Sequence, residues 1–302
     1  MIDHVIDLSD APAALRVRLE QLVIEREGQP AVTVPLADIA VVILAHPQLS
    51  CTQAVLAGLA ARGAALIVCD DRRLPAGLML PLATHFAQTE RIAAQARAAR
   101  PVGKRCWQQV VRAKIRAQAD LLMRLRGDDY GLTGLVGAVR SGDPANVEAQ
   151  AARRYWPALF ADDNFRRRHE AEDQNRLLNY GYAVLRAIVG RAVCAAGLHP
   201  SLGIHHHNRY DAFCLADDLM EPYRTVVDEA VVEYTAGLGS DAPLDRAAKQ
   251  ALLGALTGRY ASAGESRSLF DWAGRTAASL ARIFMKQDDR LFYPGGLRGV
   301  ST

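Results

Sequence analysis

The feature that most constrains the fold of this 302-residue chain is a change of sequence pattern near residue 85. Before that point, short apolar or β-branched runs are separated by Gly, Pro or Asp, a pattern typical of strands. The runs occupy residues 16–25, 31–34, 39–45, 65–69 and 78–82. One helix is predicted among them over residues 51–62, because Gly63 follows it as a C-cap glycine would. We therefore expect a small β-rich, β-sandwich-like domain with one helix over residues 1–85.

The rest of the chain is rich in Ala, Leu and Arg at helical spacing, and no strand pattern competes with this spacing. Helices are expected over residues 89–99, 107–125, 173–196, 215–236, 243–260 and 266–286. Another helix is expected to start at Asp143-Pro144, with Asp143 as its N-cap, and to end near Pro157. The fold class is therefore α+β, with a larger all-α domain over residues 86–302. Residues 293–302 contain turn residues without periodicity, and we expect a tail that orders only with a partner.

Composition is typical of a soluble intracellular protein. Half of the residues are hydrophobic and 23% are charged, which excludes a mainly disordered or fibrous chain. No apolar run reaches the roughly 18–20 residues of a membrane span, and the first residues lack the features of a signal peptide. Five scattered cysteines without a CxxC pair argue against a disulfide framework and a thiolate zinc site. We expect a cytoplasmic protein that has no membrane partner.

Basic residues are concentrated in two stretches, although the net charge is only +3. Residues 91–126 contain ten positive charges and one acid, Asp120, and a second cluster lies within residues 153–168. Such clusters favour a polyanion such as nucleic acid, although a solvated helix face explains any one of them about equally well. On charge alone, the candidate DNA contacts are Arg112, Lys114, Arg116, Arg153, Arg154, Arg166 and Arg167.

The densest group of polar residues lies within residues 203–224. Three consecutive histidines at 205–207 precede a helix start that contains Asp217, Asp218 and Glu221. A helix places Asp218 and Glu221 on one face, because they are three residues apart. A histidine with paired carboxylates can supply nitrogen and oxygen ligands to a divalent ion. The alternative is that Asp217 caps the helix and that its first turn is simply solvated.

A second candidate group surrounds Glu148, in the helix expected from residue 143. Alanines at 149, 151 and 152 would let another helix approach closely. An acid among small residues is a poor pattern for a solvated surface, which favours a cleft for Glu148, with a surface position as the alternative. Arg153 and Arg154 follow one to two turns later, where they are either phosphate contacts or an ordinary exposed helix end.

Four segments taken in order carry a family resemblance: NVEAQAARRYW, DQNRLLNYGYAVLRA, GLHPSLGIHH and LADDLMEPYR. Together they resemble the integrase of CRISPR spacer acquisition, whose pattern is a helical Glu, a Gly-x-x-His turn and an Asp-x-x-Glu/Asp helix start. The chain length and the DLMEPYR form look most like the type II systems. The resemblance covers nearly the whole chain, because this family also has an N-terminal β domain and a C-terminal helical domain.

The resemblance implies that Glu148, His206 and Glu221 are the catalytic ligands of a divalent metal ion, Mg²⁺ or Mn²⁺. Asp218 matches a position that binds the metal in some relatives. An imidazole among the ligands suits Mn²⁺ slightly better than Mg²⁺.

The histidine assignment depends on the position of one glycine. His206 follows Gly203 by three residues, as the Gly-x-x-His pattern requires. Because three histidines are consecutive, His205 is the alternative ligand, and His207 fits the pattern less well.

The implied reaction joins the 3′-hydroxyl ends of short duplex DNA, the prespacer, to the borders of a CRISPR repeat by transesterification at phosphorus. The implied assembly is a homodimer, with dimer contacts in the N-terminal domain, bound to the small ferredoxin-like subunit of CRISPR adaptation. The type II effector nuclease is a further candidate partner. Two other functions remain open: a metal-dependent nuclease for branched or single-stranded DNA, and a non-catalytic DNA-binding helical scaffold.

Overall fold

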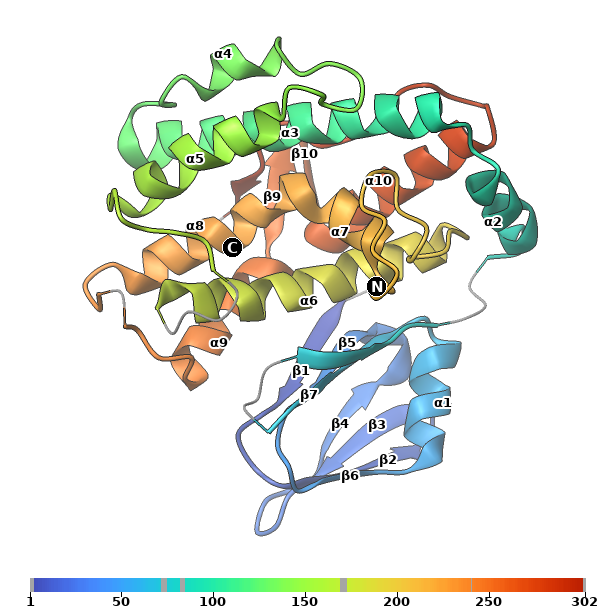
Figure 1. The fold of residues 1–302 in the computed structure, drawn as a ribbon. Helices are drawn as coiled ribbons and strands as arrows, with labels where there is room; N and C mark the ends of the chain where they lie inside the picture. Colours follow the sequence, from blue (N-terminus) through green and yellow to red (C-terminus); the bar gives the residue numbers. More distant parts are fainter. Residues whose placement is uncertain (1–2, 72–74, 82–84, 169–172, 240, 301–302) are drawn as a thin grey trace.

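The computed structural model describes residues 3–71, 75–81, 85–168, 173–239 and 241–300. A β-rich base lies on one side of the molecule, and a layer of helices covers it (Figure 1). The N-terminal part of the chain forms the base and the remainder forms the helical layer, as the sequence predicts. The boundary expected at residue 85 adjoins residues 82–84, which lie outside the described residues, as does the end of the strand expected over 78–82.

The first sheet of the base has four strands in the order β1-β5-β7-β8. Their bounds are β1 (His4–Leu8), β5 (Ile39–Leu44), β7 (Ala65–Cys69) and β8 (Pro75–Met79). The strands β1, β5 and β7 are parallel, whereas β8 is antiparallel to β7. Within β5, Val42 belongs to the core of the base, and Val41 and Ile43 belong to the core under the helices. This sheet is therefore covered on both faces, which explains the unbroken apolar run of β5.

The second sheet has the strand order β4-β3-β2-β6. Its strands are β2 (Ala13–Arg18), β3 (Gln21–Glu25), β4 (Val32–Pro35) and β6 (Leu49–Cys51). The single run expected over residues 16–25 is divided into two strands, because Leu19 and Glu20 have positive φ angles and form a two-residue hairpin turn. The helix α1 (Gln53–Ala61) packs against β2 and β7 and adds Val55 and Leu59 to the core of the base. The predicted β-rich region with one α-helix is confirmed.

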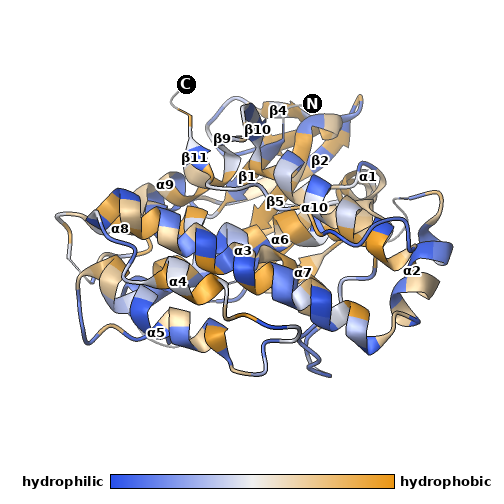
Figure 2. Cartoon of the chain, turned by 90° about the horizontal axis from the view of Figure 1, so that it is seen from above, coloured by the Kyte–Doolittle hydropathy of each residue, from blue (hydrophilic) through white to orange (hydrophobic). Residues whose placement is uncertain are grey.

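The helical layer is built around α6, which runs through its centre and contacts α7, α8, α9, α10 and the strand β7. The long helix α3 crosses the top of the layer and carries many hydrophilic residues (Figure 2). None of the helices in the described ranges is both long and apolar enough to cross a membrane. The helices and the 3₁₀ turns are α2 (Gln88–Ala96), α3 (Arg100–Arg126), α4 (Leu132–Val136), α5 (Val147–Phe160), α6 (Gln174–Ala195), α7 (Cys214–Met220), α8 (Arg224–Thr235), α9 (Arg246–Thr257), α10 (Leu269–Phe284), η1 (Leu36–Asp38) and η2 (Glu221–Tyr223).

Several expected helix boundaries are wrong. The helix α5 begins at Val147 and not at Asp143, because Asn146 is its N-cap. It also continues through Pro157 for one turn and ends where Ala161 adopts a left-handed backbone conformation. The helix expected over residues 215–236 is divided into α7, the 3₁₀ turn η2 and α8, since Pro222 lies within η2.

A small third sheet, with the strand order β10-β9-β11, is present in the helical region and was not predicted. Its strands are β9 (Arg259–Ser262), β10 (Glu265–Ser268) and β11 (Arg298–Gly299). They shorten the helices expected over 243–260 and 266–286, because Ala263 and Gly264 form a hairpin turn with positive φ angles. The strand β11 pairs with β9, so the tail expected to order only with a partner is ordered within the chain as far as residue 300.

Candidate active site

The candidate residues lie where α3 contacts the two segments that carry the predicted acids. The helix α3 packs against α5, which carries Glu148, and against α7 and η2, which carry Asp218 and Glu221. The histidine loop at 203–207 follows α6 and leads into α7. The sequence-predicted acids and histidines, which are up to 73 positions apart, therefore lie in one region of the fold.

Glu148 lies in the first turn of α5, and side-chain caps fix this turn. The Asp143 carboxylate accepts the backbone N–H groups of Val147 and Glu148 at 2.9 and 3.0 Å. The Asn146 side chain accepts the N–H of Ala149. Asp143 was predicted as the N-cap, but Asn146 holds that position, and Asp143 instead accepts N–H groups of the first turn from further upstream. The capped turn holds the Glu148 backbone in place beside α3.

Glu221 lies at the junction between α7 and η2, directly before Pro222, and is 6% exposed. Its Oε1 is 3.0 Å from Arg224 Nε, and its Oε2 is 2.6 Å from Lys114 Nζ. Burial alone would raise the pKa of Glu221, but the charges of Arg224 and Lys114 outweigh it and lower the pKa to about 2. The Glu221 carboxylate is therefore ionised at any physiological pH.

Lys114 connects the two acids. Its Nζ lies 2.6 Å from Glu148 Oε1 as well as 2.6 Å from Glu221 Oε2. Burial would lower the pKa of Lys114, but the carboxylates of Glu221 and Glu148 raise it above its ordinary value. The sequence assigned Lys114 to the candidate DNA contacts on charge alone. The structure instead places it between two candidate metal ligands, a position that no local sequence signal indicates.

Asp218 organises the histidine loop. Its carboxylate is fully buried, and its Oδ2 accepts the backbone N–H groups of Ile204 and His205 at 2.7 and 2.9 Å. Its Oδ1 is 2.5 Å from His206 Nδ1 and also accepts the His206 backbone N–H at 3.3 Å. The hydrogen bond from His206 Nδ1 to Asp218 raises the pKa of His206 against the effect of burial. Asp218 was predicted as a possible metal ligand, yet both its oxygens are occupied by donors from this loop.

The Gly-x-x-His spacing has a steric cause in this loop. A Cβ atom at Gly203 would collide with the backbone carbonyl of His206 and would lie 3.0 Å from Asp218 Oδ2. The chain turns back on itself so closely that only glycine fits at this position. The turn brings the His206 backbone and ring to the same carboxylate.

The three histidines have different environments. The His205 ring stacks on Trp107 of α3, with centroids 4.1 Å apart and planes within 3°. Burial and the neighbouring His206 lower the pKa of His205. Asp218 orients His206, and the charges of Glu221 and Glu148 also raise the pKa of His206. His207, in contrast, is exposed. The geometry favours His206 over His205 as the histidine of the site.

Among the described residues, no three His, Cys, Asp or Glu side chains converge closely enough to form a complete metal-ligand set. The donors nevertheless fit a divalent ion, because the carboxylates of Glu148 and Glu221 already share one cationic atom. Within the described part of the chain, Glu221 Oε2 is buried and makes the ion pair with Lys114 but no well-formed hydrogen bond. A proton held on His206 Nδ1 by Asp218 leaves Nε2 as the ring atom for a ligand. Such oxygen and nitrogen donors suit Mg²⁺ or Mn²⁺.

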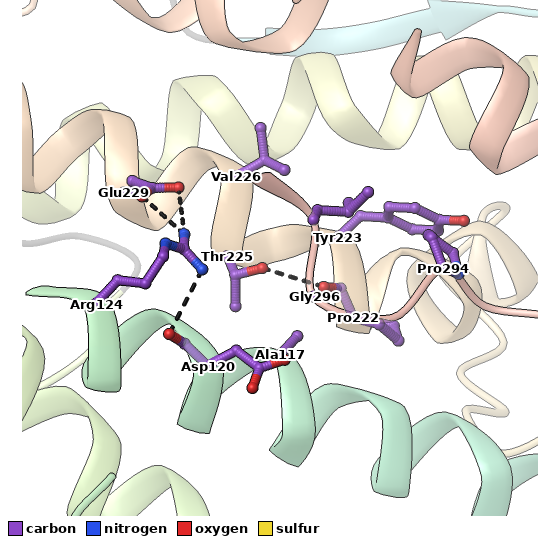
Figure 3. A pocket seen from close by; sticks show the side chains of 11 residues that line it. Ala117, Asp120, Arg124, Pro222, Tyr223, Thr225, Val226, Glu229, Pro294 and Gly296 are labelled. Atoms are coloured by element: carbon purple, nitrogen blue, oxygen red, sulfur yellow. Dashed lines mark hydrogen bonds and ion pairs between the residues drawn. The ribbon is translucent and has the colours of Figure 1, made fainter. Parts of the chain in front are cut away.

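The helices under the site are anchored to α3 by an ion pair (Figure 3). Arg124 of α3 donates two hydrogen bonds to the Glu229 carboxylate of α8, at 2.7 and 2.8 Å. A small pocket between these helices is bordered by Pro222 and Tyr223 of η2 and by Gly296 of the C-terminal segment. The ion pair and the pocket walls hold α8 and η2, and therefore Glu221, against α3.

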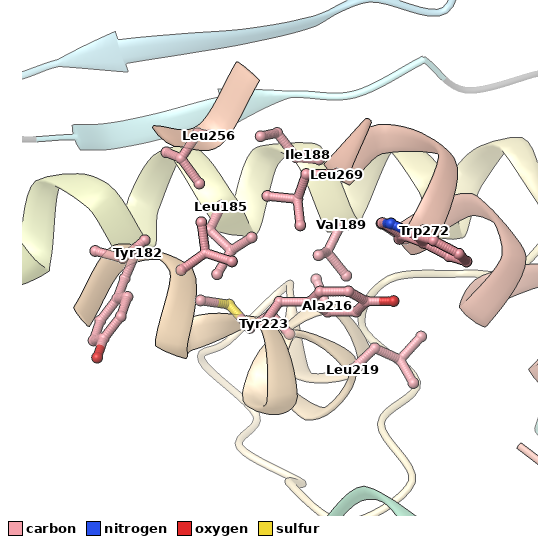
Figure 4. Close-up of a cluster of buried hydrophobic side chains, with 14 of the residues drawn as sticks. Tyr182, Leu185, Ile188, Val189, Ala216, Leu219, Tyr223, Leu256, Leu269 and Trp272 are labelled. Carbon is pink, nitrogen blue, oxygen red and sulfur yellow. The ribbon is translucent and has the colours of Figure 1, made fainter. Parts of the chain in front are cut away.

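A hydrophobic cluster packs α7 and η2 against α6 (Figure 4). Leu185 and Val189 of α6 belong to the same buried core as Leu219 of α7 and Tyr223 of η2. The Tyr223 hydroxyl also lies 2.6 Å from Thr276 Oγ1 of α10. The backbone that carries Asp218 and Glu221 is thus part of the larger of the two hydrophobic cores among the described residues.

A buried polar network beside this core was not anticipated from the sequence. The Asp228 carboxylate accepts the hydroxyl hydrogen bonds of Tyr155 and Tyr182, the former at 2.6 Å. Burial raises the pKa of Asp228 to about 6, although both tyrosines lower it. The Arg224 guanidinium lies over the Tyr182 ring, 4.5 Å from its centroid, and pairs with Glu221. This network connects α5, α6 and α8 to the Glu221 carboxylate.

The remaining candidate DNA contacts differ in whether their side chains already form hydrogen bonds within the protein. Arg116 and Arg153 are exposed, and no polar contact of their guanidinium groups is recorded among the described residues. Arg154 and Arg166 are exposed but donate to backbone carbonyls of Gly131 and Asp163.

Two of the predicted basic contacts are tied into the protein. Arg112 donates to the Val139 carbonyl at 2.8 Å. Arg167 donates to the Asn175 and Asn179 side chains at 2.9 and 2.6 Å.

A basic groove of about 620 Å³ follows α3 and extends the predicted basic stretch. Its cationic lining residues are Arg112, Arg116, Arg282 and Arg290. The two arginines after residue 280 were not predicted, because they are isolated in the sequence and only the fold places them beside α3.

Comparison with known proteins decides the family. The family model for CRISPR associated protein Cas1 matches residues 8–237. The chain belongs to the Cas1 family. The resemblance inferred from the ordered motifs is therefore confirmed.

A curated relative and two solved structures agree with this assignment. A CRISPR-associated endonuclease Cas1 from Neisseria meningitidis serogroup C (strain 8013) is 40% identical over 221 residues, 72% of this chain and 71% of the relative. The structure of a casposase bound to integration product has a TM-score of 0.78 at 19% identity and covers 95% of this chain and 92% of that chain. A chain of a Cas6-RT-Cas1–Cas2 complex has a TM-score of 0.77 at 18% identity, over 97% of this chain and 36% of that chain. The Cas1 relationship confirms the predicted family, whose curated member from Neisseria meningitidis is a CRISPR-associated endonuclease.

Proposed function

We propose that this Cas1 family member inserts short duplex DNA into a CRISPR repeat by metal-dependent attack of a 3′-hydroxyl on a phosphodiester. One observation carries the proposal: Glu148 and Glu221 converge on a single cationic atom beside an oriented His206. Paired carboxylates with an imidazole form the kind of site at which phosphoryl transfer is assisted by a divalent ion. The resemblance carried by the ordered motifs implies the same three residues.

Glu148, Glu221 and His206 are the residues that would hold Mg²⁺ or Mn²⁺. When bound, the ion supplies stabilisation of the negative charge that develops on the phosphate oxygens. Asp218 supports the site indirectly: it holds the His206 ring through Nδ1, which leaves Nε2 as the ring atom for the metal. Arg224 pairs with Glu221 Oε1 and keeps this carboxylate ionised and oriented.

The DNA is bound mainly through its backbone. Exposed arginines along α3 and in the middle of α5, such as Arg116 and Arg153, neutralise phosphates and make the binding salt-dependent. Arg154 and Arg166 lie at exposed positions that allow the same role. Arg112 and Arg167 are bonded within the protein, so their contribution to DNA binding is indirect.

The active assembly is a homodimer, because the two ends of one prespacer require two reaction centres and each chain has one. We assign dimer contacts to residues 1–85, and catalysis and DNA binding to residues 86–302. The Cas6-RT-Cas1–Cas2 structure supports a small second subunit, which the family resemblance describes as ferredoxin-like. The casposase bound to integration product supports the integration reaction. The type II effector nuclease is a further proposed partner, and the cytoplasm, where the array lies, is the proposed location.

A strand-transfer assay with site variants tests this proposal. A labelled duplex is incubated with a repeat-containing plasmid, Mn²⁺ or Mg²⁺, the chain and its small partner subunit. Joined product that is lost with EDTA and in Glu148→Ala, His206→Ala and Glu221→Ala, but retained in Asp217→Asn, is the expected result. Asp217 is a matched control because it neighbours Asp218 but pairs with Arg186 of α6.

Two outcomes would contradict the proposal. Metal-dependent shortening of the duplex without joining would favour the nuclease. DNA binding without either product, unchanged in the variants and in EDTA, would favour the non-catalytic scaffold.

A further inference from the structure

We infer that the Lys114 ammonium is an internal cation that occupies the metal position of the metal-free protein and has to leave before a divalent ion can bind Glu148 and Glu221. This inference rests on the proposed metal site. It assigns Lys114 a positioning role in which the residue preserves the geometry of the two acids and sets the affinity of the site for metal.

The contacts of Lys114 are those of a cation held by two ligands. Its Nζ is 2.6 Å from one oxygen of each carboxylate, so the two oxygens lie within twice that distance of each other. The Glu221 side chain is 8% exposed and the Lys114 side chain 13% exposed, so solvent screens this group poorly. Two carboxylates this close and this buried would repel each other without a cation between them.

The residue type suits a cation that has to move. The chain contains four lysines among its 36 basic residues, at positions 104, 114, 249 and 286. Lysine carries a compact charge on a flexible four-carbon stem, whereas the planar guanidinium of arginine locks into bidentate pairs such as that between Arg124 and Glu229. Lysine thus occurs, in a chain that otherwise prefers arginine, between the two carboxylates that the proposed metal would need.

The ammonium and a divalent ion cannot share these oxygens. Oxygen ligands bind Mg²⁺ at about 2.0–2.1 Å, so an ion on Glu148 Oε1 and Glu221 Oε2 would occupy the space of the ammonium group. Both cations are positive, so they also repel each other in this poorly screened site. Metal binding and the present position of Lys114 therefore exclude each other.

A purely structural role would give the same ion pairs without any exchange. In that case Lys114 would remain between the acids when metal is added, and its removal would lower stability without changing the intrinsic metal affinity. The two interpretations differ in two measurable quantities, the metal affinity of a variant and the exposure of the Lys114 amine.

The first measurement is Mn²⁺ affinity by calorimetry for the unaltered protein, Lys114→Met and Lys104→Met. Lys104 is a matched control because it is an exposed lysine on the same helix. Lys114→Met is expected to bind Mn²⁺ roughly tenfold more tightly, the scale of effect seen when partners of a metal ligand change. In EDTA its melting temperature is expected to fall, while Lys104→Met matches the unaltered protein in both respects.

The second measurement uses the unaltered protein, so it decides the question even if Lys114→Met fails to fold. Lysine acetylation is followed by mass spectrometry in EDTA and in saturating Mn²⁺. The acetylation rate of Lys114 is expected to rise several-fold with Mn²⁺, because its amine is released from the carboxylates, while that of Lys104 stays constant.

The contradicting results are distinct. Mn²⁺ binding by the unaltered protein with neither a tighter Lys114→Met nor a change in Lys114 acetylation would overturn this inference and leave the proposed metal site intact. Absence of Mn²⁺ binding in both the unaltered protein and Lys114→Met would overturn the inference together with the proposed metal-dependent function.

Discussion

The Asp218 carboxylate accepts a hydrogen bond from His206 Nδ1 at 2.5 Å and at the same time binds the backbone of the loop that carries this histidine. The buried acid thus sets the ring orientation and the loop conformation together. Glu221 follows three residues later at the junction of α7 and η2. The histidine and the second acid of the site are therefore positioned by one short segment of backbone.

Replacement of Asp218 tests this coupling. In Asp218→Ala, backbone N–H groups of residues 204–206 lose their acceptor, and each buried donor left unsatisfied costs about 1–3 kcal/mol. We expect a lower melting temperature and a loss of strand transfer of roughly 10–100-fold, because His206 loses its orienting partner. Asp217→Asn serves as the control in the same assays. Full activity of Asp218→Ala would show that the carboxylate does not position His206.

Gly203→Ala tests the steric origin of the turn. Its Cβ would collide with the His206 carbonyl, so the loop has to shift away from Asp218. We expect strand transfer to fall at least as far as in Asp218→Ala, with a smaller change in melting temperature because the loop is partly exposed. The control is Gly274→Ala in α10, where a Cβ meets nothing within 4 Å and helix propensity rises. Unchanged activity in Gly203→Ala would contradict the close turn.

Asp228 predicts a specific pH dependence of stability. Its pKa is raised to about 6 in the folded protein, so the folded state holds this proton more tightly than the unfolded chain. Its contribution is therefore present at low pH and is lost as the pH rises through about 6.

Urea unfolding of the unaltered protein and Asp228→Asn measures this contribution. The asparagine amide can still bond both tyrosine hydroxyls but does not titrate. Between about pH 4 and pH 7, the unaltered protein is expected to lose on the order of 3 kcal/mol of unfolding free energy relative to the variant. Parallel pH profiles for the two proteins would contradict a raised pKa at Asp228.

The basic residues separate into DNA contacts and structural residues. Arg116→Ala and Arg153→Ala are each expected to weaken duplex binding and to reduce the slope of log affinity against log salt by about one, with little change in melting temperature. Arg112→Ala removes a hydrogen bond to the Val139 carbonyl, so it is expected to lower the melting temperature instead. Fluorescence anisotropy over a salt series and thermal melts measure both effects. An unchanged salt slope in Arg116→Ala and Arg153→Ala would contradict their assignment to phosphate contacts.

The sequence correctly predicted elements whose ends are set by capping residues close by in the chain. The helix expected over 173–196 is α6, because Asp173 is its N-cap and Gly197 adopts a positive φ angle just after its end. The hairpin of β9 and β10 was missed, since its residues show no apolar alternation and its turn depends on the positive φ angles of Ala263 and Gly264.

In the candidate site, too, the sequence predicted which residues take part but not the contacts that depend on tertiary packing. The family resemblance brought Glu148, His206 and Glu221 into one hypothesis, and the fold places them in one region around α3. The contacts of Lys114 depend on how α3 packs against α5 and η2. The sequence could therefore identify Lys114 only as one of many basic residues on α3. The resemblance implied Asp218 as a possible ligand. Its bonds to the histidine loop could not be predicted, because they form only when the turn at Gly203 closes.

The most direct test of the account compares two donor duplexes that differ in one oxygen atom. One carries 3′-hydroxyl ends and the other 3′-deoxy ends, and each is incubated with the repeat plasmid, Mn²⁺, the chain and its small partner. We predict that only the 3′-hydroxyl donor becomes joined to the plasmid, and that Glu148→Ala and Glu221→Ala abolish joining. Plasmid cleavage at the same rate with either donor, without joining, would contradict the integrase and leave a nuclease.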